Sequence, residues 1–516
     1  MKKKLLLVFF FTISLLLFIL SPSTNEKNDK VIEDNYDALK IKHASFLKNS
    51  PFKKTLQLSK KERKKLGIPP NKYYEREWEL TMNPATGNPE PSKVLELQSI
   101  RNKKNKSISS RPPGDLINNS WEERGPNNVG GRTRVVLFDP NDINNEIVYA
   151  GGVSGGLWKN NNITDPNSSW NQVSGVPGNM NISCITVDPN NSNIWYIGTG
   201  EQYTFGAAVG NGVYVTTDGG LNWKHVPIQL SGGGTSGNNF AGIYYINNII
   251  AWNNNNNTEV YIGVGTHIYG DASNPINWLG FQNTGLYKGV DSADAGDEVD
   301  DASEWSRVQT ASLDFSYNGS TYYYIPNDFE ISVDNTLWFG CIGTPGTDED
   351  EDSNNGQQKH GRGKVFNTTN GIIWTEITTL PNSNRVELAV SSYDSNKIFA
   401  LTEGTDGEPH IYSTIDGFNL PITDPSNNTV ELPKPNDADT GIPVNDFTRG
   451  QDFYNLVIEV DPTNDAIIYV GGIDLFRSND SGNNWSQISK WSDNNNLADL
   501  NCSIVHADQH AFTFRP

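Results

Sequence analysis

The sequence predicts an all-β fold: a β-propeller of four-stranded antiparallel blades, with six full blades and the start of a seventh. The first observation is a unit of four strand-like runs that recurs along the chain. The second is length, because 516 residues exceed one ordinary core and favour an architecture that adds core with each repeat. The third is composition: 47 Gly, 13 Trp, 20 Tyr and 21 Phe against 3 Met suit short strands and tight turns.

The N-terminus predicts export. Lys2, Lys3 and Lys4 precede an apolar run over 5–20, which is the charge and hydropathy pattern of a secretory signal. We therefore expect residues 1–24 to be a signal peptide and the protein to be secreted or displayed at the cell surface. An uncleaved N-terminal anchor is the alternative, since no small-x-small cleavage site follows the run; without it the mature protein has no membrane span.

Residues 25–113 are expected to be a basic leader or linker, partly helical or disordered, before a propeller over 114–516. The charge reverses at this boundary: 1–113 hold 23 basic and 11 acidic residues, and 114–516 hold 17 basic and 49 acidic residues. Because residues 114–516 are strongly acidic, they should repel nucleic acid, and nucleic acid is excluded as a partner. The three cysteines lie far apart without metal-finger spacing, which excludes a disulfide scaffold.

The repeated unit has four parts. A β-branched run ends in Asp-Pro, a Tyr-containing apolar run ends in Gly, a short run pairs Leu or Val with an aromatic residue, and a turn leads to Trp. The copies begin at or near Val135, Ile185, Ile249, Ile331, Glu387 and Val457. Four short strands repeated around an axis are typical of a propeller, in which each blade buries its faces against its neighbours.

Two of the turns carry a recognisable motif. The segments 216–223 and 478–485 resemble the BNR repeat or Asp-box, Ser/Thr-x-Asp-x-Gly-x-x-Trp. The whole stretch 121–516 is similar to secreted bacterial BNR propellers of the sortilin-like, xyloglucanase-like and sialidase-like type. The resemblance implies that the motif links the third and fourth strands of a blade and that its residues are structural: Asp218, Gly220, Trp223, Asp480, Gly482 and Trp485. The Asp accepts backbone N–H groups, Gly supplies positive φ and Trp packs on the sheet.

The working face is expected where the loops are long. Loops after the second and fourth strands of a blade lie on one side of a propeller, and here they are the long ones: 199–212, 227–243, 264–284, 343–362 and 421–453. Aromatic residues in or beside these loops suit the stacking of sugar rings. The candidate ligand-binding residues are Tyr203, Phe205, His267, Tyr269, Trp278 and Tyr454. We expect a binding or adhesion module for glycans or extracellular proteins.

A glycoside hydrolase is the alternative. A carboxylate pair on the same face would cleave a glycosidic bond, and the candidate catalytic acids are Glu201, Asp328 and Asp452. Sialidase activity is disfavoured, because the resemblance would require an arginine triad and the sequence offers only Arg132 and Arg134 near the expected place. Xyloglucanases use two facing propellers, and this chain has room for one.

Two patterns suggest a divalent cation. His506, Asp508 and His510 alternate, so on a strand they would share one face and could ligate Zn²⁺; hydrogen bonds to neighbouring loops are the alternative. The acidic stretches 291–301 and 348–352 could bind Ca²⁺ or be solvated loops.

The last residues, 503–516, have the pattern of a first strand. Arg515 and Pro516 stand where the other copies have Asp-Pro. We expect the first strand of a seventh blade here, with the chain truncated before its other strands.

Overall fold

The computed structural model describes two compact units, each considered by itself. The described residues are 38–50, 53–65, 72, 76, 79, 82, 131–178, 180–201, 203, 210–226, 228, 244–266, 284–289, 305–317, 320–342, 363–420, 424 and 426–516. The described leader is helical over 38–48, at η1 (Thr55–Gln57) and at α3 (Lys60–Lys65). Within these ranges no helix has the length and apolarity to cross a membrane. The signal peptide expected over 1–24 lies outside the described residues.

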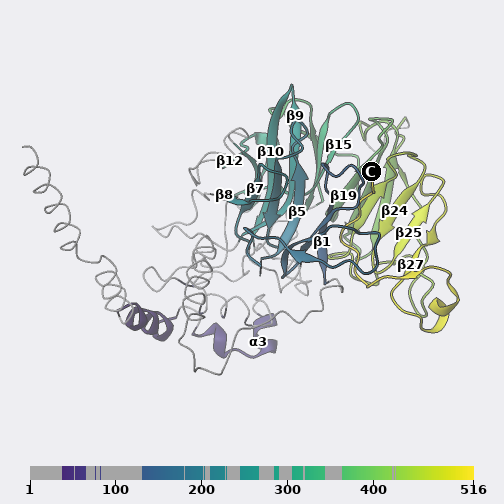
Figure 1. Ribbon diagram of the computed structural model, residues 1–516. Helices are drawn as coiled ribbons and strands as arrows, with labels where there is room; N and C mark the ends of the chain where they lie inside the picture. The colour runs from purple at the N-terminus through teal and green to yellow at the C-terminus, as the bar shows by residue number, and fades with distance from the viewer. Residues whose placement is uncertain are drawn as a thin grey trace, which may run out of the picture. The chain divides into compact units, whose positions relative to one another are not determined.

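The body is a β-propeller, whose successive blades run from blue through teal and green to yellow in Figure 1. The first blade is β1 (Thr133–Phe138), β2 (Val148–Gly152), β3 (Gly156–Asn160) and β4 (Asn171–Gln172). The second is β5 (Ile182–Val187), β6 (Trp195–Thr199), β7 (Val213–Thr216) and β8 (Lys224–Val226). The third is β9 (Tyr244–Asn254), β10 (Asn257–Thr266), β11 (Gly285–Gly289) and β12 (Trp305–Arg307).

The fourth blade is β15 (Ile325–Ile331), β16 (Leu337–Ile342), β17 (Val365–Thr368) and β18 (Thr375–Ile377). The fifth is β19 (Ser383–Val390), β20 (Ile398–Gly404), β21 (Pro409–Thr414) and β22 (Val430–Glu431). The sixth is β23 (Val457–Val460), β24 (Ile468–Gly471), β25 (Leu475–Ser478) and β26 (Ser486–Gln487). A hairpin of β13 (Asp314–Tyr317) and β14 (Ser320–Tyr323) precedes blade four, and β27 (Ser489–Lys490) pairs in parallel with β28 (Ser503–Ile504) after blade six. The predicted all-β propeller is confirmed.

The inner strands of successive blades pack against one another and form the core. Contacts join β1 to β5, β5 to β9, β9 to β15, β15 to β19 and β19 to β23. The glycine that ends the second strand of a blade lies beneath the inner strand of the next blade. A Cβ on Gly151 would lie 2.7 Å from Ile182 Cγ2, and one on Gly263 would overlap the carbonyl oxygen of Pro326. The Gly of the repeat is therefore required by the close packing of neighbouring blades.

The C-terminal segment lies where a seventh inner strand belongs. On one side, Gln509 N donates to the Gly472 carbonyl oxygen at 2.8 Å, and the Phe512 ring stacks on Tyr469 at 4.8 Å. On the other side, Arg515 pairs with Glu146 of blade one, at 2.5 Å. The segment thus contacts both blade six and blade one, but only Ser503–Ile504 of it is a strand, so the expected first strand of a seventh blade stays a prediction. The expected truncation stays a prediction.

The two Asp-containing turns are held by their own side chains. Asp218 Oδ1 accepts backbone N–H bonds from Leu221 and Asn222, at 3.1 and 2.9 Å. Gly220 has a φ of +84°, and a Cβ there would meet Tyr149 and Trp195. Asp480 and Gly482 repeat this arrangement in blade six: the Asn484 backbone N–H donates to Asp480 Oδ1, and Gly482 has a φ of +86°. The side chains of Trp223 and Trp485 each donate to a backbone carbonyl oxygen, of Gly220 and Pro433.

Replacing Asp218 with alanine is expected to lower the free energy of unfolding by about 1 kcal/mol, because the backbone N–H groups of Leu221 and Asn222 then lose their carboxylate acceptor. Urea titration followed by tryptophan fluorescence measures this. Leu221→Ala on the same turn is the control, since that side chain is 67% exposed and should change little. Equal stability of the two variants would contradict a structural role for the carboxylate.

Candidate functional site

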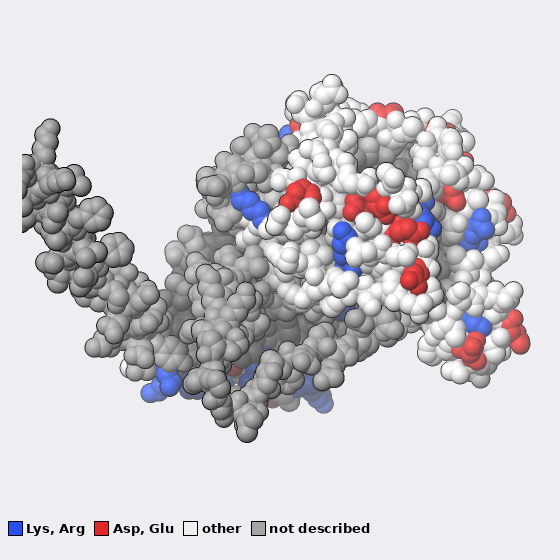
Figure 2. Space-filling view, viewed as in Figure 1, with Lys and Arg blue, Asp and Glu red and all other residues white. Residues whose placement is uncertain are grey.

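A polar pocket of about 200 Å³ opens into the central channel of the propeller. Its walls come from the inner strands β1, β5, β9, β15, β19 and β23 and from residues 510–512, so every blade position contributes. Tyr203, in the long loop after β6, also lines the pocket. The opening of the pocket, called the mouth below, therefore lies on the face that carries the long loops, called the large-loop face. In the space-filling view, acidic side chains gather in patches over the propeller, with basic side chains between them (Figure 2).

β-Bulges point side chains into this pocket. The registers of β1, β5, β9, β15 and β19 each shift by one residue near the start of the strand. A bulge turns the extra side chain away from the regular alternation. The extra residues that line the pocket are Arg134, Ser183, Asn247 and Asn327. The same local irregularity, repeated in successive blades, thus supplies polar groups to one place.

Glu201 is the counter-ion of two arginines at this mouth. Its side chain is 1% exposed; it pairs with Arg134 at 2.7 Å and with the more exposed Arg132 at 3.4 Å. Tyr454 Oη donates to Glu201 Oε1 at 2.8 Å. Both carboxylate oxygens are therefore engaged, which suits fixing the pocket wall better than attacking a substrate, the role expected for Glu201.

The aromatic rings of the mouth are covered by cations. The guanidinium groups of Arg134 and Arg385 lie 4.4 and 4.3 Å from the centre of the Tyr203 ring. Arg134 and Arg132 lie over Tyr454, at 4.7 and 5.1 Å. The two tyrosines are 6% and 4% exposed. Tyr203 and Tyr454 therefore bind arginines in this arrangement and do not present a face for sugar stacking. The other candidates, Phe205, His267, Tyr269 and Trp278, lie outside the described residues, as do the acidic stretches 291–301 and 348–352.

Asp328 belongs to a group of four carboxyls inside the channel. Its oxygens accept from Leu388 N at 2.7 Å and Asn248 Nδ2 at 3.1 Å. Burial, followed by repulsion from Glu387, raises the pKa of Asp328 well above its usual value.

The other three members were not predicted. They are Glu330 on β15, Glu387 on β19 and Glu459 on β23, all lining the same pocket. Burial, and then Glu459, raises the pKa of Glu330 well above its usual value; burial, and then Glu387, raises the pKa of Glu459 to about 8. A single acid within a β-branched run, as in Val457-Ile-Glu-Val460, was the available signal.

Asp452 stands apart from this group, in the loop before β23. It is 4% exposed, its Oδ1 accepts from Phe453 N at 3.1 Å, and its Oδ2 has no partner among the described residues. Burial, and then Asp446, raises the pKa of Asp452 to about 6. A carboxyl of this kind can donate a proton near neutral pH.

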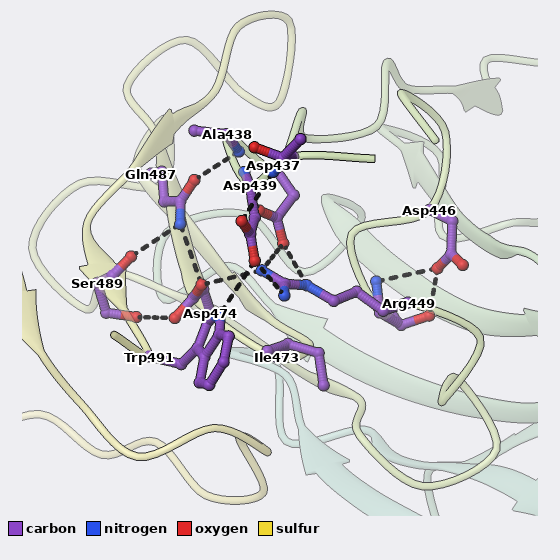
Figure 3. A network of polar contacts seen from close by, with 12 residues as sticks. Asp437, Ala438, Asp439, Asp446, Arg449, Ile473, Asp474, Gln487, Ser489 and Trp491 are labelled. Atoms are coloured by element: carbon purple, nitrogen blue, oxygen red, sulfur yellow. Dashed lines mark hydrogen bonds and ion pairs between the residues drawn. The ribbon is translucent and has the colours of Figure 1, made fainter. Parts of the chain in front are cut away.

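The loop that carries Asp452 and Tyr454 is anchored by Arg449 (Figure 3). The Arg449 guanidinium pairs with Asp437 at 2.7 Å, Asp439 at 2.8 Å and Asp474 at 3.7 Å. Burial, and then Asp437, raises the pKa of Asp474 to about 7. Because Asp474 follows β24, this network fixes the loop to blade six.

The predicted metal triad does not form. His506 is exposed, Asp508 accepts from Asn455 Nδ2 at 2.9 Å, and His510 packs edge-on against Tyr454 at 4.4 Å. Asp508 has a φ of +75°, so the backbone turns there and the alternation that would align the three side chains is lost. Across the described ranges no three His, Cys, Asp or Glu side chains are arranged to hold a metal ion. The prediction that these residues share one strand face is wrong.

Comparison with known proteins gives a limited result. No family model matches the chain. A stretch of 111 residues, 21% of this chain and 12% of the relative, is 32% identical to a probable oligoxyloglucan-reducing end-specific xyloglucanase of Neosartorya fischeri.

Solved structures similar to the chain at low identity include the following three. They are a GH74 xyloglucanase from Xanthomonas campestris (13% identity, 70% of this chain and 46% of that chain, TM-score 0.41), a GH74 enzyme from Niastella koreensis (15%, 70% and 66%, 0.31) and YCF48 from Cyanidioschyzon merolae (12%, 69% and 84%, 0.37). The chain covers less than two thirds of the length of the xyloglucanase and of the GH74 enzyme.

Proposed function

We propose that this chain is an exported β-propeller that binds a glycan at the mouth of its central channel, on the large-loop face. The observation that carries the proposal is the pocket itself, into which β-bulges of successive blades direct Arg134, Ser183, Asn247 and Asn327. A concave site with several converging polar groups is typical of small-ligand recognition. The short stretch of identity to a xyloglucanase supports a glycan over an extracellular protein as the ligand.

Binding is favoured over hydrolysis because the candidate acids do not form a free pair. Glu201 is neutralised by Arg134 and Arg132, and Asp328 is held by two N–H donors. Glycosidases need two carboxyls that both reach the scissile bond. The raised pKa of Asp452 keeps the hydrolase as the second candidate function, since it suits a general acid.

The test is a glycan array, followed by titration of the best ligand against two matched variants. Arg132→Gln removes a cation that pairs with Glu201 beside the pocket, and the Arg132 side chain is 43% exposed, so the fold should be retained. We expect affinity to fall at least about tenfold, as for loss of a charged hydrogen bond. Arg477→Gln on β25 is the control, and its affinity should stay within about twofold of the original protein.

Equal affinity of the two variants would contradict binding at this mouth. Hydrolysis is followed in the same screen as the release of reducing ends. Release that disappears in Asp452→Asn would favour the hydrolase. Release that persists in Glu201→Gln, Asp328→Asn and Asp452→Asn alike would refute these three acids as catalytic groups.

A further inference from the structure

We propose that the short-turn face of blades four and five is a docking surface for a cationic, amphipathic segment of a partner protein. The short-turn face is formed by the turns after the first and third strands of each blade, on the side opposite the large-loop face. The partner segment would carry lysine or arginine beside aliphatic side chains. This inference goes beyond glycan binding at the mouth and does not depend on it.

Five exposed apolar side chains lie in the short turns of these two neighbouring blades. They are Val333, Ile372 and Ile373 in blade four and Tyr393 and Ile415 in blade five, and we call them the apolar patch. Each is more than half exposed, and the adjacent pair Ile372 and Ile373 is 77% and 67% exposed. Single exposed apolar residues are ordinary, whereas a group on one face of neighbouring blades is typical of a surface that binds protein.

The turn of blade four does not itself need isoleucine at these two positions. It is held by Asn370, whose Oδ1 accepts from the backbone N–H groups of Ile372 and Ile373, at 2.9 Å each. The corresponding turn of blade six is one residue longer and has Asn483 and Asn484 at the two positions before its tryptophan. Polar side chains therefore suit this turn, and the two isoleucines are better explained by contact with another molecule.

The turns that carry the apolar patch are fixed by hydrogen bonds. The hairpin between β9 and β10 bonds to both turns of blade four: Asn335 of the first turn donates to this hairpin at 2.8 Å, and Asn254 of the hairpin donates to the second turn at 3.3 Å. In blade five, a backbone hydrogen bond of 2.9 Å joins turn 391–397 to turn 414–417. A surface ordered in advance loses less conformational entropy when a partner binds.

The charge of the short-turn face indicates the chemistry of the partner. Among the described turns after first and third strands, Lys397 is the single basic side chain, and it pairs with Asp465 at 3.2 Å. Asp334 and Asp416 each directly follow a residue of the apolar patch. Burial opposes their ionisation, but hydrogen bonds, from a serine and a threonine two residues earlier, outweigh it and hold both pKa values below the usual value. The face is therefore anionic near neutral pH and attracts a cationic segment.

A second copy of this chain fits the surface less well than a cationic segment does. Two copies would bring faces of like charge together, which is unfavourable. Anionic lipid would be repelled for the same reason. A cationic, amphipathic segment instead gains electrostatic attraction and the burial of the five apolar side chains.

Fluorescence anisotropy of the whole chain with a labelled hexapeptide of alternating lysine and leucine tests the surface. We expect saturable binding that weakens as NaCl rises from about 50 to about 500 mM, because salt screens exposed charges. A hexapeptide of alternating glutamate and leucine should not bind. One of alternating lysine and serine should bind at least about tenfold more weakly, since it buries no aliphatic side chains.

The double variant Ile372→Asn/Ile373→Asn makes the test specific. It reproduces the pair of asparagines in the turn of blade six, so it should fold, and it should weaken peptide binding at least about tenfold. Ile504→Asn on β28 is the matched control, because that side chain is 58% exposed and lies outside the short turns. Its affinity should stay within about twofold of the original protein, as should that of Arg132→Gln, which tests glycan binding at the mouth.

Three results would each overturn the docking surface: no saturable binding to the original protein, equal binding of the glutamate peptide, or equal affinity of the double variant and Ile504→Asn. Sedimentation velocity is the companion measurement, and we expect a monomer. A dimer that dissociates in the double variant would identify a second copy as the occupant and overturn the cationic partner.

Discussion

Gly263→Ala is expected to lower the free energy of unfolding by about 3 kcal/mol, the upper range for overpacking a close-packed interior. A Cβ at Gly263 would overlap the carbonyl oxygen of Pro326, which belongs to the inner strand of the next blade. Backbone cannot move aside as a side chain can, so blade three and blade four would have to separate. Differential scanning calorimetry measures the fall in Tm.

Gly289→Ala is the matched control. Gly289 also lies in blade three, but its nearest surrounding atoms would be 3.7 Å from the new Cβ, which is ordinary contact. Its Tm should remain within about 2 °C of the original protein, since a well-accommodated substitution changes stability by roughly 0.5 kcal/mol or less. A Tm for Gly263→Ala that equals the control would show that the blades are not packed through these glycines.

The repeated parts of the fold could be predicted because their causes are local. Asp188 accepts from the backbone N–H of Asn190 two residues later, so the Asp-Pro turn is stabilised by residues that stand together in the sequence. The strand-ending glycine was equally visible as a motif. The reason for this glycine could not be predicted, because the atoms that exclude a Cβ belong to the neighbouring blade.

The candidate site depended on contacts that the sequence does not reveal. Tyr454 and Glu201 form a hydrogen bond across 253 positions of the chain. The sequence predicts that both lie in or beside the long loops of the working face, whereas in the structure both side chains are buried. The bulges that direct Arg134 and Asn327 inward also leave no periodic mark, because an inserted residue resembles ordinary strand sequence. His506, Asp508 and His510 show the opposite case, in which regular spacing was interrupted by one residue with positive φ.

The stability of the propeller is expected to fall as pH rises from about 5 to 8. Buried carboxyls with raised pKa values bind protons in the folded state that the unfolded chain has already lost, so alkali favours unfolding. The pKa of Asp452 is raised to about 6, that of Asp474 to about 7 and that of Glu459 to about 8. Their contribution is complete below about pH 4, the unfolded value, and is lost as pH passes through these folded values.

At low pH the stability of the propeller is limited by aspartates in the surface turns. Hydrogen bonds, first from the Asn484 side chain, lower the pKa of Asp480, and that contribution is lost as pH falls below about 4. Maximum Tm is therefore expected between about pH 4 and pH 6, more acidic than for most proteins. Thermal unfolding across pH 3 to 9 by circular dichroism measures the profile.

Asp452→Asn tests the contribution of one carboxyl to the fall in stability between pH 5 and pH 8. The amide keeps an acceptor for Phe453 N and cannot ionise, so the variant should lose less stability between pH 5 and 8. A folded pKa of about 6 means that the carboxyl loses about 1.4 kcal/mol of stabilisation between pH 5 and pH 8, and this is the loss that the variant should not show. Asp499→Asn is the control, since Asp499 is exposed and its substitution should leave the slope unchanged. A Tm that is flat or rising from pH 5 to 8 in the original protein would contradict the protonated state of the buried carboxyls.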